Sequence, residues 1–165
     1  MAKKPTVVDL LQRILAIIEN KGAAVIIPAK PRVINDRFTD NDDGTISDKE
    51  NKTLIIKDPS KIPGFDKIMT FEEAKKACEN LSYGGYNSGW RMPTLKEEQS
   101  IRDYTRHEPA WNTDIFGGKY DNWYWTKTEC AWNKEAAWCV GSGYGGVLLN
   151  DKHFRNYVRP VRSCQ

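Results

Sequence analysis

Residues 123–150 have the sequence WYWTKTECAWNKEAAWCVGSGYGGVLLN, which indicates the fold class of the chain. Three short segments within it, Trp123–Thr126, Ala136–Val140 and Gly146–Leu149, are apolar or alternate between apolar and polar side chains. Residues rich in Gly and Asn separate them, as is typical of short β-strands joined by turns. We therefore predict an antiparallel sheet, to which Tyr157–Val161 adds the last strand.

Two helices are predicted upstream of this sheet. Thr70 and Glu73 have the spacing of a capping box, and Thr94 and Glu97 repeat it at the start of a second helix that runs to about Tyr104. The first helix has an apolar face that we expect to be buried, made of Phe71, Ala74, Ala77, Cys78 and Leu81.

A hairpin is predicted ahead of both helices, over Arg37–Ile56. Its turn, Asp40–Gly44, ends in an Asp-Gly step, which is a strong turn signal, and Lys52–Lys57 is the next strand. Strands, then two helices, then strands indicate an α+β domain.

The N-terminal segment predicts a separate element. Thr6–Asn20 has apolar residues at every third or fourth position, as in an amphipathic helix, and Pro28 and Pro31 indicate a hinge after it. We assign residues 1–35 to this helix and linker and residues 36–165 to the main domain. The apolar stripe needs a partner: it either packs on its own domain or forms a seam in a homo-oligomer.

The composition argues against several classes of protein. A net charge of +3 is too small to indicate nucleic-acid binding. No apolar run approaches the ~20 residues of a membrane span. Asp9, Arg13 and Glu19 interrupt the first apolar run, so we expect no secretory signal, and the compartment stays undetermined.

The acidic turn is a weak calcium candidate. On the pattern of an EF-hand loop, Asn41, Asp43 and Glu50 occupy ligand positions, but Thr39 stands where the first carboxylate is wanted. The flanking sequence predicts strands instead of two helices. Because Asp-rich turns commonly bind no metal, we expect no metal site here.

We expect no cofactor and no catalytic activity. Gly141–Gly146 matches the dinucleotide-binding glycine pattern by letter, but a predicted strand follows it where that site needs a helix. Cys130 or Cys139 could be combined with His107 or His153 as a nucleophile and base, yet nothing in the local sequence supports such a pair. The residues therefore favour binding over catalysis.

The residues between Tyr120 and Asn156 form the candidate binding surface. Tyrosine supplies rigid contact area, while Asn, Ser, Gly and Asp supply adaptable hydrogen bonds. We predict Tyr124 and Tyr144 as anchors and place Trp90, Trp125 and Trp138 in the core; ordinary loop composition is the alternative explanation. The predicted ligand-contact residues are Tyr120, Asp121, Asn122, Tyr124, Asn133, Lys134, Ser142, Tyr144, Asn150, Asp151, His153 and Asn156.

Several motifs occur together in the order found in one known family. The segments are Arg37–Asp48, Thr70–Ala74, Gly84–Tyr86, Trp90–Thr94 with Leu95 and Glu97, Tyr124–Thr126, Ala137–Trp138 and Tyr157–Arg162. In this set the chain resembles the C-terminal domains of Legionella collagen-like adhesins, a C-type-lectin-like family.

The resemblance implies a C-type-lectin-like fold that binds a protein or a cell-surface component. Such folds also serve as the variable proteins of diversity-generating retroelements, including those of phages and archaeal viruses, in which substitutions concentrate near the C-terminus. The resemblance further implies that Cys78 could pair with Cys164, and Cys130 with Cys139, unless the compartment is reducing.

Two other functions stay open from the sequence. One is a glycan-binding adhesin domain that uses the basic tail formed by Lys152, Arg155, Arg159 and Arg162, although a solvated strand face is the favoured explanation of this tail. The other is a calcium-stabilised structural module.

Overall fold

The computed structural model describes residues 8, 12 and 30–164. The predicted helix Thr6–Asn20, apart from Val8 and Gln12, and the short strand expected at Ala23–Ile27 lie outside these residues. Within the described part of the chain, no helix is long and apolar enough to cross a membrane.

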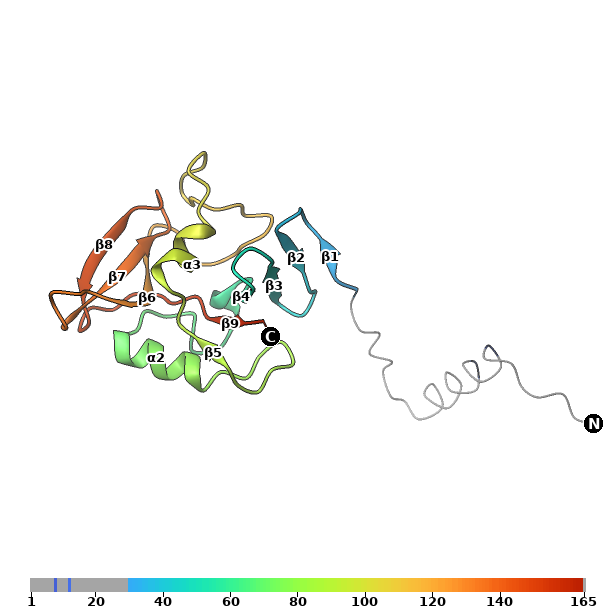
Figure 1. Cartoon of the computed structure of the whole chain (residues 1–165), viewed down its shortest axis with the longest axis horizontal. Coiled ribbons are helices and arrows are strands. Elements are labelled where there is room, and N and C mark those ends of the chain that lie inside the picture. Colours follow the sequence, from blue (N-terminus) through green and yellow to red (C-terminus); the bar gives the residue numbers. More distant parts are fainter. Residues whose placement is uncertain (1–7, 9–11, 13–29, 165) are drawn as a thin grey trace, which may run out of the picture.

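Two antiparallel sheets form the domain; in Figure 1 the smaller one lies at its left, and the larger one extends from its centre to the right. The larger sheet has the strand order β1-β2-β3-β4-β9-β5, and its strands are β1 (Arg32–Val33), β2 (Phe38–Asp40), β3 (Thr45–Asp48), β4 (Thr53–Ile56), β9 (Val161–Ser163) and β5 (Trp90–Arg91). The smaller sheet has the order β6-β7-β8, and its strands are β6 (Trp123–Glu129), β7 (Ala136–Gly141) and β8 (Val147–Asp151). With helices α2 (Phe71–Glu79) and α3 (Leu95–Ser100) and the 3-10 turn η1 (Pro59–Lys61), this confirms the predicted α+β class.

Strands β2 and β3 form the predicted hairpin, and hydrogen bonds from side chains of the turn stabilise it. The Asp40 side chain accepts a hydrogen bond from the Asp42 amide at 3.0 Å, and that of Asp43 accepts one from the Thr45 amide at 2.9 Å. Gly44 has φ of 86°, which favours glycine, and a β-carbon there would lie 2.1 Å from the Tyr83 hydroxyl oxygen.

Both predicted capping boxes form, but the second helix is shorter than predicted. In α2 the Glu73 carboxylate accepts from the Thr70 amide at 2.9 Å, and the Thr70 hydroxyl accepts from the Glu73 amide at 3.3 Å. The helix α3 ends at Ser100, so its predicted extension to Tyr104 is wrong. The chain leaves the helix there because the Asp103 amide donates to the Ala110 carbonyl oxygen at 2.9 Å and turns the backbone into a loop.

The last strand also lies later than predicted, at Val161–Ser163 instead of Tyr157–Val161. Tyr157 instead forms a parallel bridge to Tyr124, while Val161 and the residues after it pair with β4 and β5. The segment therefore passes from the smaller sheet to the larger one and joins the two.

The smaller sheet is covered on both faces over part of its length. Helix α2 packs on one face, where Phe71 lies edge-to-face against the fully buried Trp125, 5.6 Å between ring centroids. On the other face, Tyr124 belongs to a second cluster with Trp111 and Ile101. Trp90 and Trp125 are in the core as predicted; Trp138 is only half-buried and packs against the exposed Trp132, so its assignment to the core is wrong.

The four cysteines are unpaired in this structure, so neither implied disulfide is present. Cys78 is a buried residue of α2, whereas Cys164 is exposed after β9. Cys139 pairs with Trp125 across the strands, and the amide of Cys130 donates to the Ala136 carbonyl oxygen, so the hairpin register does not place these two thiols opposite each other.

Candidate functional site

Three loops meet at one end of the smaller sheet. They are residues 103–110, residues 119–122 and residues 142–146, and we call them the three-loop surface. Ser142, which is completely buried, connects them. Its hydroxyl accepts from the Asn122 amide and donates to the Asn122 carbonyl oxygen, both at 2.9 Å, and its own carbonyl accepts from the Ala110 amide at 2.8 Å.

A further backbone bond closes the set, because the Glu108 amide donates to the Gly143 carbonyl oxygen at 2.8 Å. Since backbone groups of all three loops are joined, their relative positions do not depend on long side chains. Binding residues on loops are typically held by a rigid scaffold in this way.

A small hollow of about 170 Å³ opens on this surface. Its lining combines glycines with polar and aromatic residues: Asp121, Asn122, Trp123, Gly141, Gly143, Tyr144 and Gly146. A β-carbon on Gly141 would approach the Trp123 ring to 3.2 Å, and one on Gly146 would approach it to 3.9 Å. Because Gly141 and Gly146 have no side chains, space stays open beside the Trp123 indole. This packing accounts for the glycine-rich motif without a bound nucleotide.

Tyr144 forms one wall of the hollow and is held in place although 69% of it is exposed. Its hydroxyl donates to the Glu108 carboxylate at 2.7 Å, and its ring stacks on His107 with 6.2 Å between centroids. The hydrogen bond to Glu108 and the negative charges of Glu108 and Asp121 raise the pKa of Tyr144.

Tyr120 and Asp121 complete the exposed part of the surface. Tyr120 is half-exposed, and its ring lies 6.1 Å from that of the buried Trp111. Its carbonyl oxygen accepts from the Asn122 side-chain amide at 2.6 Å. Asp121 has φ of 52° and is exposed at the tip of the turn.

Three predicted contact residues are buried, so their assignment to the exposed surface is wrong. The Tyr124 hydroxyl accepts from the Lys119 amide at 2.9 Å and donates to its carbonyl oxygen at 3.1 Å, and burial raises the pKa of Tyr124 to about 12. Ser142 joins the loops, and Asn156 pairs through its backbone with Met69. Tyr124 is therefore a structural support of the surface and not an anchor for a ligand.

The other predicted contact residues lie at the opposite end of the smaller sheet. Asn133 and Lys134 are exposed in the β6–β7 turn, and Asp151 is opposite Ala136 in the strand register. Asn150 is half-buried, and His153 is exposed with its Nδ1 2.8 Å from the Asp151 carboxylate. The structure thus divides the predicted surface into two separate groups.

Some exposed side chains were missed by the sequence interpretation. Tyr104, His107 and Glu108 belong to the three-loop surface, and Trp132 and Phe154 are exposed near the second group. No periodic signal marks them, because they lie in irregular loops or at the ends of strands. Their polar and aromatic character alone could have placed them among the candidates.

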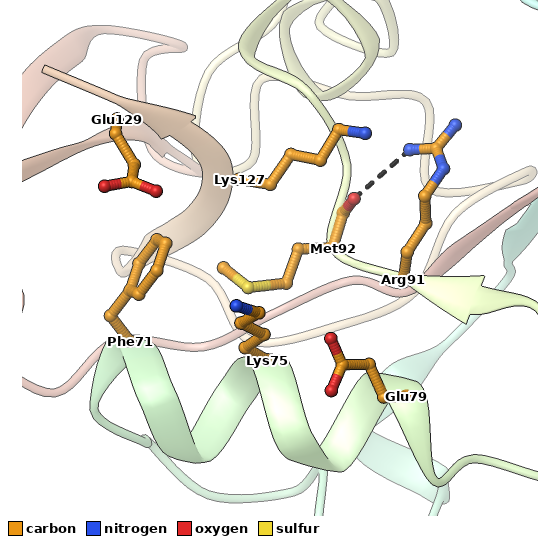
Figure 2. A pocket seen from close by; sticks show the side chains of 7 residues that line it. All are labelled: Phe71, Lys75, Glu79, Arg91, Met92, Lys127 and Glu129. Atoms are coloured by element: carbon orange, nitrogen blue, oxygen red, sulfur yellow. Dashed lines mark hydrogen bonds between the residues drawn. The ribbon is translucent and has the colours of Figure 1, made fainter. Parts of the chain in front are cut away.

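A second hollow, of about 240 Å³, lies between α2 and β6 and contains none of the predicted residues (Figure 2). Its base is apolar, formed by Phe71 and Met92, and lysines extend over it from both elements. Two of its charged groups are already paired within the protein, Arg91 with Glu97 at 2.8 Å and Glu129 with Lys152 at 2.6 Å. We therefore take the three-loop surface, and not this hollow, as the candidate site.

The side chains proposed as calcium ligands already have hydrogen-bond or ion-pair partners within the hairpin region. Asn41 bonds to Thr45 and Ser47, Asp43 accepts from Thr45, and Glu50 lies 3.3 Å from Arg37. Among residues 8, 12 and 30–164, no group of three His, Cys, Asp or Glu side chains is arranged to hold a metal ion.

Among the described residues, no hydrogen bond joins the thiol of Cys130 or Cys139 to the imidazole of His107 or His153. The Cys139 thiol is buried and receives a contact from the Asn156 side-chain amide at 3.5 Å, and burial raises its pKa well above the ordinary range. His107 stacks on Tyr144 and His153 bonds to Asp151. A protonated thiol without an adjacent base is a packing group.

The fold and the site together define a small α+β domain whose exposed loops are tied to a buried framework, a construction that suits ligand binding. The chain belongs to the Lcl C-terminal domain family, the C-terminal domain of the Legionella collagen-like protein, whose model matches residues 39–162. This confirms the resemblance drawn from the motifs. A comparison with curated proteins found no match.

Proposed function

We propose that this domain has a C-type-lectin-like scaffold and binds a macromolecular ligand, a protein or a cell-surface component, through the three-loop surface. It acts by surface complementarity and not by catalysis. The observation that carries this proposal is the buried Ser142, which fixes three loops while Tyr120, Asp121 and Tyr144 stay exposed on them.

The composition of the surface suits this role. Exposed tyrosines contribute large contact area with few rotatable bonds, and neighbouring Asp and Asn side chains adapt their hydrogen bonds to the partner. Since the loops are joined through backbone groups, little conformational entropy is lost when a ligand binds.

We also propose that the chain is a variable protein of a diversity-generating retroelement, encoded by a phage or a virus. The separation of roles supports it, because Tyr120, Asp121 and Tyr144 are exposed whereas Ser142 and Tyr124 hold the framework. The neighbouring DNA tests it: a reverse-transcriptase gene and a near-copy of the 3′ end of this gene are expected. Their absence from the complete genome would overturn the retroelement role and leave the binding role standing.

A pair of libraries tests the scaffold itself. One randomises the exposed Tyr120, Asp121 and Tyr144, and the other randomises the buried Tyr124 and Ser142. Most members of the first library should fold, and most of the second should not, when soluble expression and thermal melting are measured. Equal losses in both libraries would contradict the proposal.

The glycan-binding alternative loses its main support. Within the basic tail, Arg159 is buried and donates to the carbonyl oxygens of Ile56 and Lys57, both at 2.8 Å. Lys152 pairs with Glu129, and Arg155 pairs with Glu73 at 2.7 Å. The fourth cation, Arg162, donates to the Ser88 carbonyl oxygen at 3.0 Å and lies over the Tyr86 ring, so all four have partners within the protein.

The calcium-stabilised module also has no support, because the hairpin residues bond to one another. The predicted homo-oligomer through Thr6–Asn20 depends on residues outside the described part of the chain and stays a prediction.

A further inference from the structure

We propose, on the basis of the proposed function, that the hollow between Trp123 and Tyr144 receives an arginine side chain from a protein ligand. The ligand is thus assigned a chemical class: a protein that presents an exposed guanidinium group. Four properties of the hollow carry this inference, namely its charge, its hydrogen-bonding groups, its aromatic walls and its size.

The charge of the hollow is negative. Asp121 lines it, and Glu108 lies behind its Tyr144 wall. In the described part of the chain, neither carboxylate has a Lys, Arg or His nitrogen within 4.0 Å. Other carboxylates of the domain are paired, for example Asp48 with Arg37 at 2.7 Å and Asp40 with Lys57 at 2.6 Å.

Two of the side-chain donors around the hollow are used within the protein, whereas the second hydrogen of the Asn122 amide and the Trp123 indole N–H stay available. The Tyr144 hydroxyl hydrogen points to Glu108, and the Asn122 side-chain amide donates to the Tyr120 carbonyl oxygen. The lining also offers three acceptors, and one of them is charged: the Asp121 carboxylate, the Asn122 side-chain carbonyl and the Tyr144 phenol oxygen. Guanidinium has five donors and a positive charge, so it complements these acceptors and the carboxylate among them, whereas a neutral sugar hydroxyl does not match the charge.

The aromatic walls favour the same group. A guanidinium plane stacks on indole and phenol rings, and this attraction is strengthened by a neighbouring carboxylate. The domain uses this contact elsewhere, since the Arg162 guanidinium lies 4.2 Å from the centroid of the Tyr86 ring.

The size selects a single side chain. The hollow of about 170 Å³ is smaller than the roughly 300 Å³ at which pockets for whole small molecules begin. Its glycines, Gly141 and Gly146, keep the space beside Trp123 open. It can therefore accommodate the end of one long side chain, with the rest of the ligand lying on the exposed tyrosines.

Titration of the isotopically labelled full chain with N-acetylarginine methylamide tests the inference by NMR. We expect saturable shifts at Gly143 and at the Trp123 indole, and affinity at least tenfold lower for Asp121→Asn. The control Asp151→Asn removes an exposed carboxylate at the other end of the sheet and should leave the affinity unchanged. The inference is overturned if arginine produces no shift while methyl glycosides do, or if Asp121→Asn binds as well as the original protein.

A peptide library selected against the full chain separates this inference from the proposed function. Peptides that contain arginine and lose binding to both Asp121→Asn and Tyr120→Ala support both. Peptides that depend on Tyr120 but not on Asp121 overturn the arginine assignment alone. Peptides that are insensitive to both substitutions overturn both proposals, provided that thermal melting shows each variant to be folded.

Discussion

The Ser142 hydroxyl makes two hydrogen bonds of 2.9 Å to the backbone of Asn122, accepting from its amide and donating to its carbonyl oxygen. The Ser142 amide adds a third bond to the same carbonyl oxygen at 2.8 Å. A buried side chain thus takes the place of a regular strand pairing where β7 ends. This contact positions Asp121 and Asn122 beside Tyr144.

Ser142→Ala should destabilise the domain by roughly 1–3 kcal/mol, because it removes both hydrogen bonds of the fully buried hydroxyl and leaves the part-buried Asn122 amide without this acceptor. Urea unfolding followed by circular dichroism measures the change. Ser82→Ala is the control, since Ser82 is exposed and its hydroxyl bonds only to Asn87. An equal loss in the two variants would mean that Ser142 has no special role.

The hydroxyls of Tyr124 and Tyr144 should differ sharply in their contribution to stability. Tyr124→Phe removes two hydrogen bonds that the fully buried Tyr124 makes to the backbone of Lys119, and it should cost about 1–3 kcal/mol. Tyr144→Phe removes one bond in an exposed setting and should change the free energy of unfolding by less than about 0.5 kcal/mol. Urea unfolding of the two variants measures both changes. A larger loss of stability in Tyr144→Phe than in Tyr124→Phe would refute the structural role of Tyr124.

Trp125→Ala should cost roughly 3–5 kcal/mol, because the ring is fully buried and its indole donates to the Met69 carbonyl oxygen at 2.8 Å. Trp132→Ala is the matched control, since 75% of Trp132 is exposed, and it should cost much less. Thermal melting compares the two. Similar midpoints would show that Trp125 is not the centre of the core.

Asp48 should make stability depend on pH in the acid range. Burial acts to raise the pKa of Asp48, but hydrogen bonds from Arg37 and Asn51 outweigh it and hold the pKa below its ordinary value. Because the folded pKa is the lower one, this stabilisation is complete above about pH 4 and is lost as the pH falls through the folded pKa.

The variant Asp48→Asn should therefore be less stable than the original protein at pH 7, and the difference should shrink as the pH is lowered below about 4. Urea unfolding at a series of pH values measures it. Asp114→Asn, at an exposed position, should show no such trend. A difference that does not change with pH would indicate that the charge of Asp48 is unimportant.

Alkylation should distinguish the four thiols. Cys164 is exposed and should react in the folded protein, whereas Cys78, Cys130 and Cys139 are buried and should react only in denaturant. Mass spectrometry without reductant counts the added groups. Fewer than four additions in denaturant would reveal disulfides and contradict the free thiols of this structure.

Much of the local structure could be predicted from short stretches of sequence. The capping boxes at Thr70 and Thr94 and the Asp-Gly turn at Gly44 form as predicted, because each depends on side chains within three or four residues of one another. The family resemblance followed from the same motifs taken in order.

The side-chain surroundings of the candidate site could not be predicted in this way. Tyr124 and Tyr144 have the same chemistry, yet one is sealed beneath Trp111 and the other is exposed beside Glu108. Alternation along β6 tells which residues share a face, but β6 is covered on both faces, so alternation does not predict exposure.

Local sequence thus specified the helices, the turns and the class of fold. The tertiary structure decided which loops meet at Ser142, which arginines are buried and where the hollow beside Trp123 opens. The physical reason is the distance along the chain: capping and turn bonds join near neighbours, whereas burial depends on segments such as residues 103–110 and 142–146 that only the folded chain brings together.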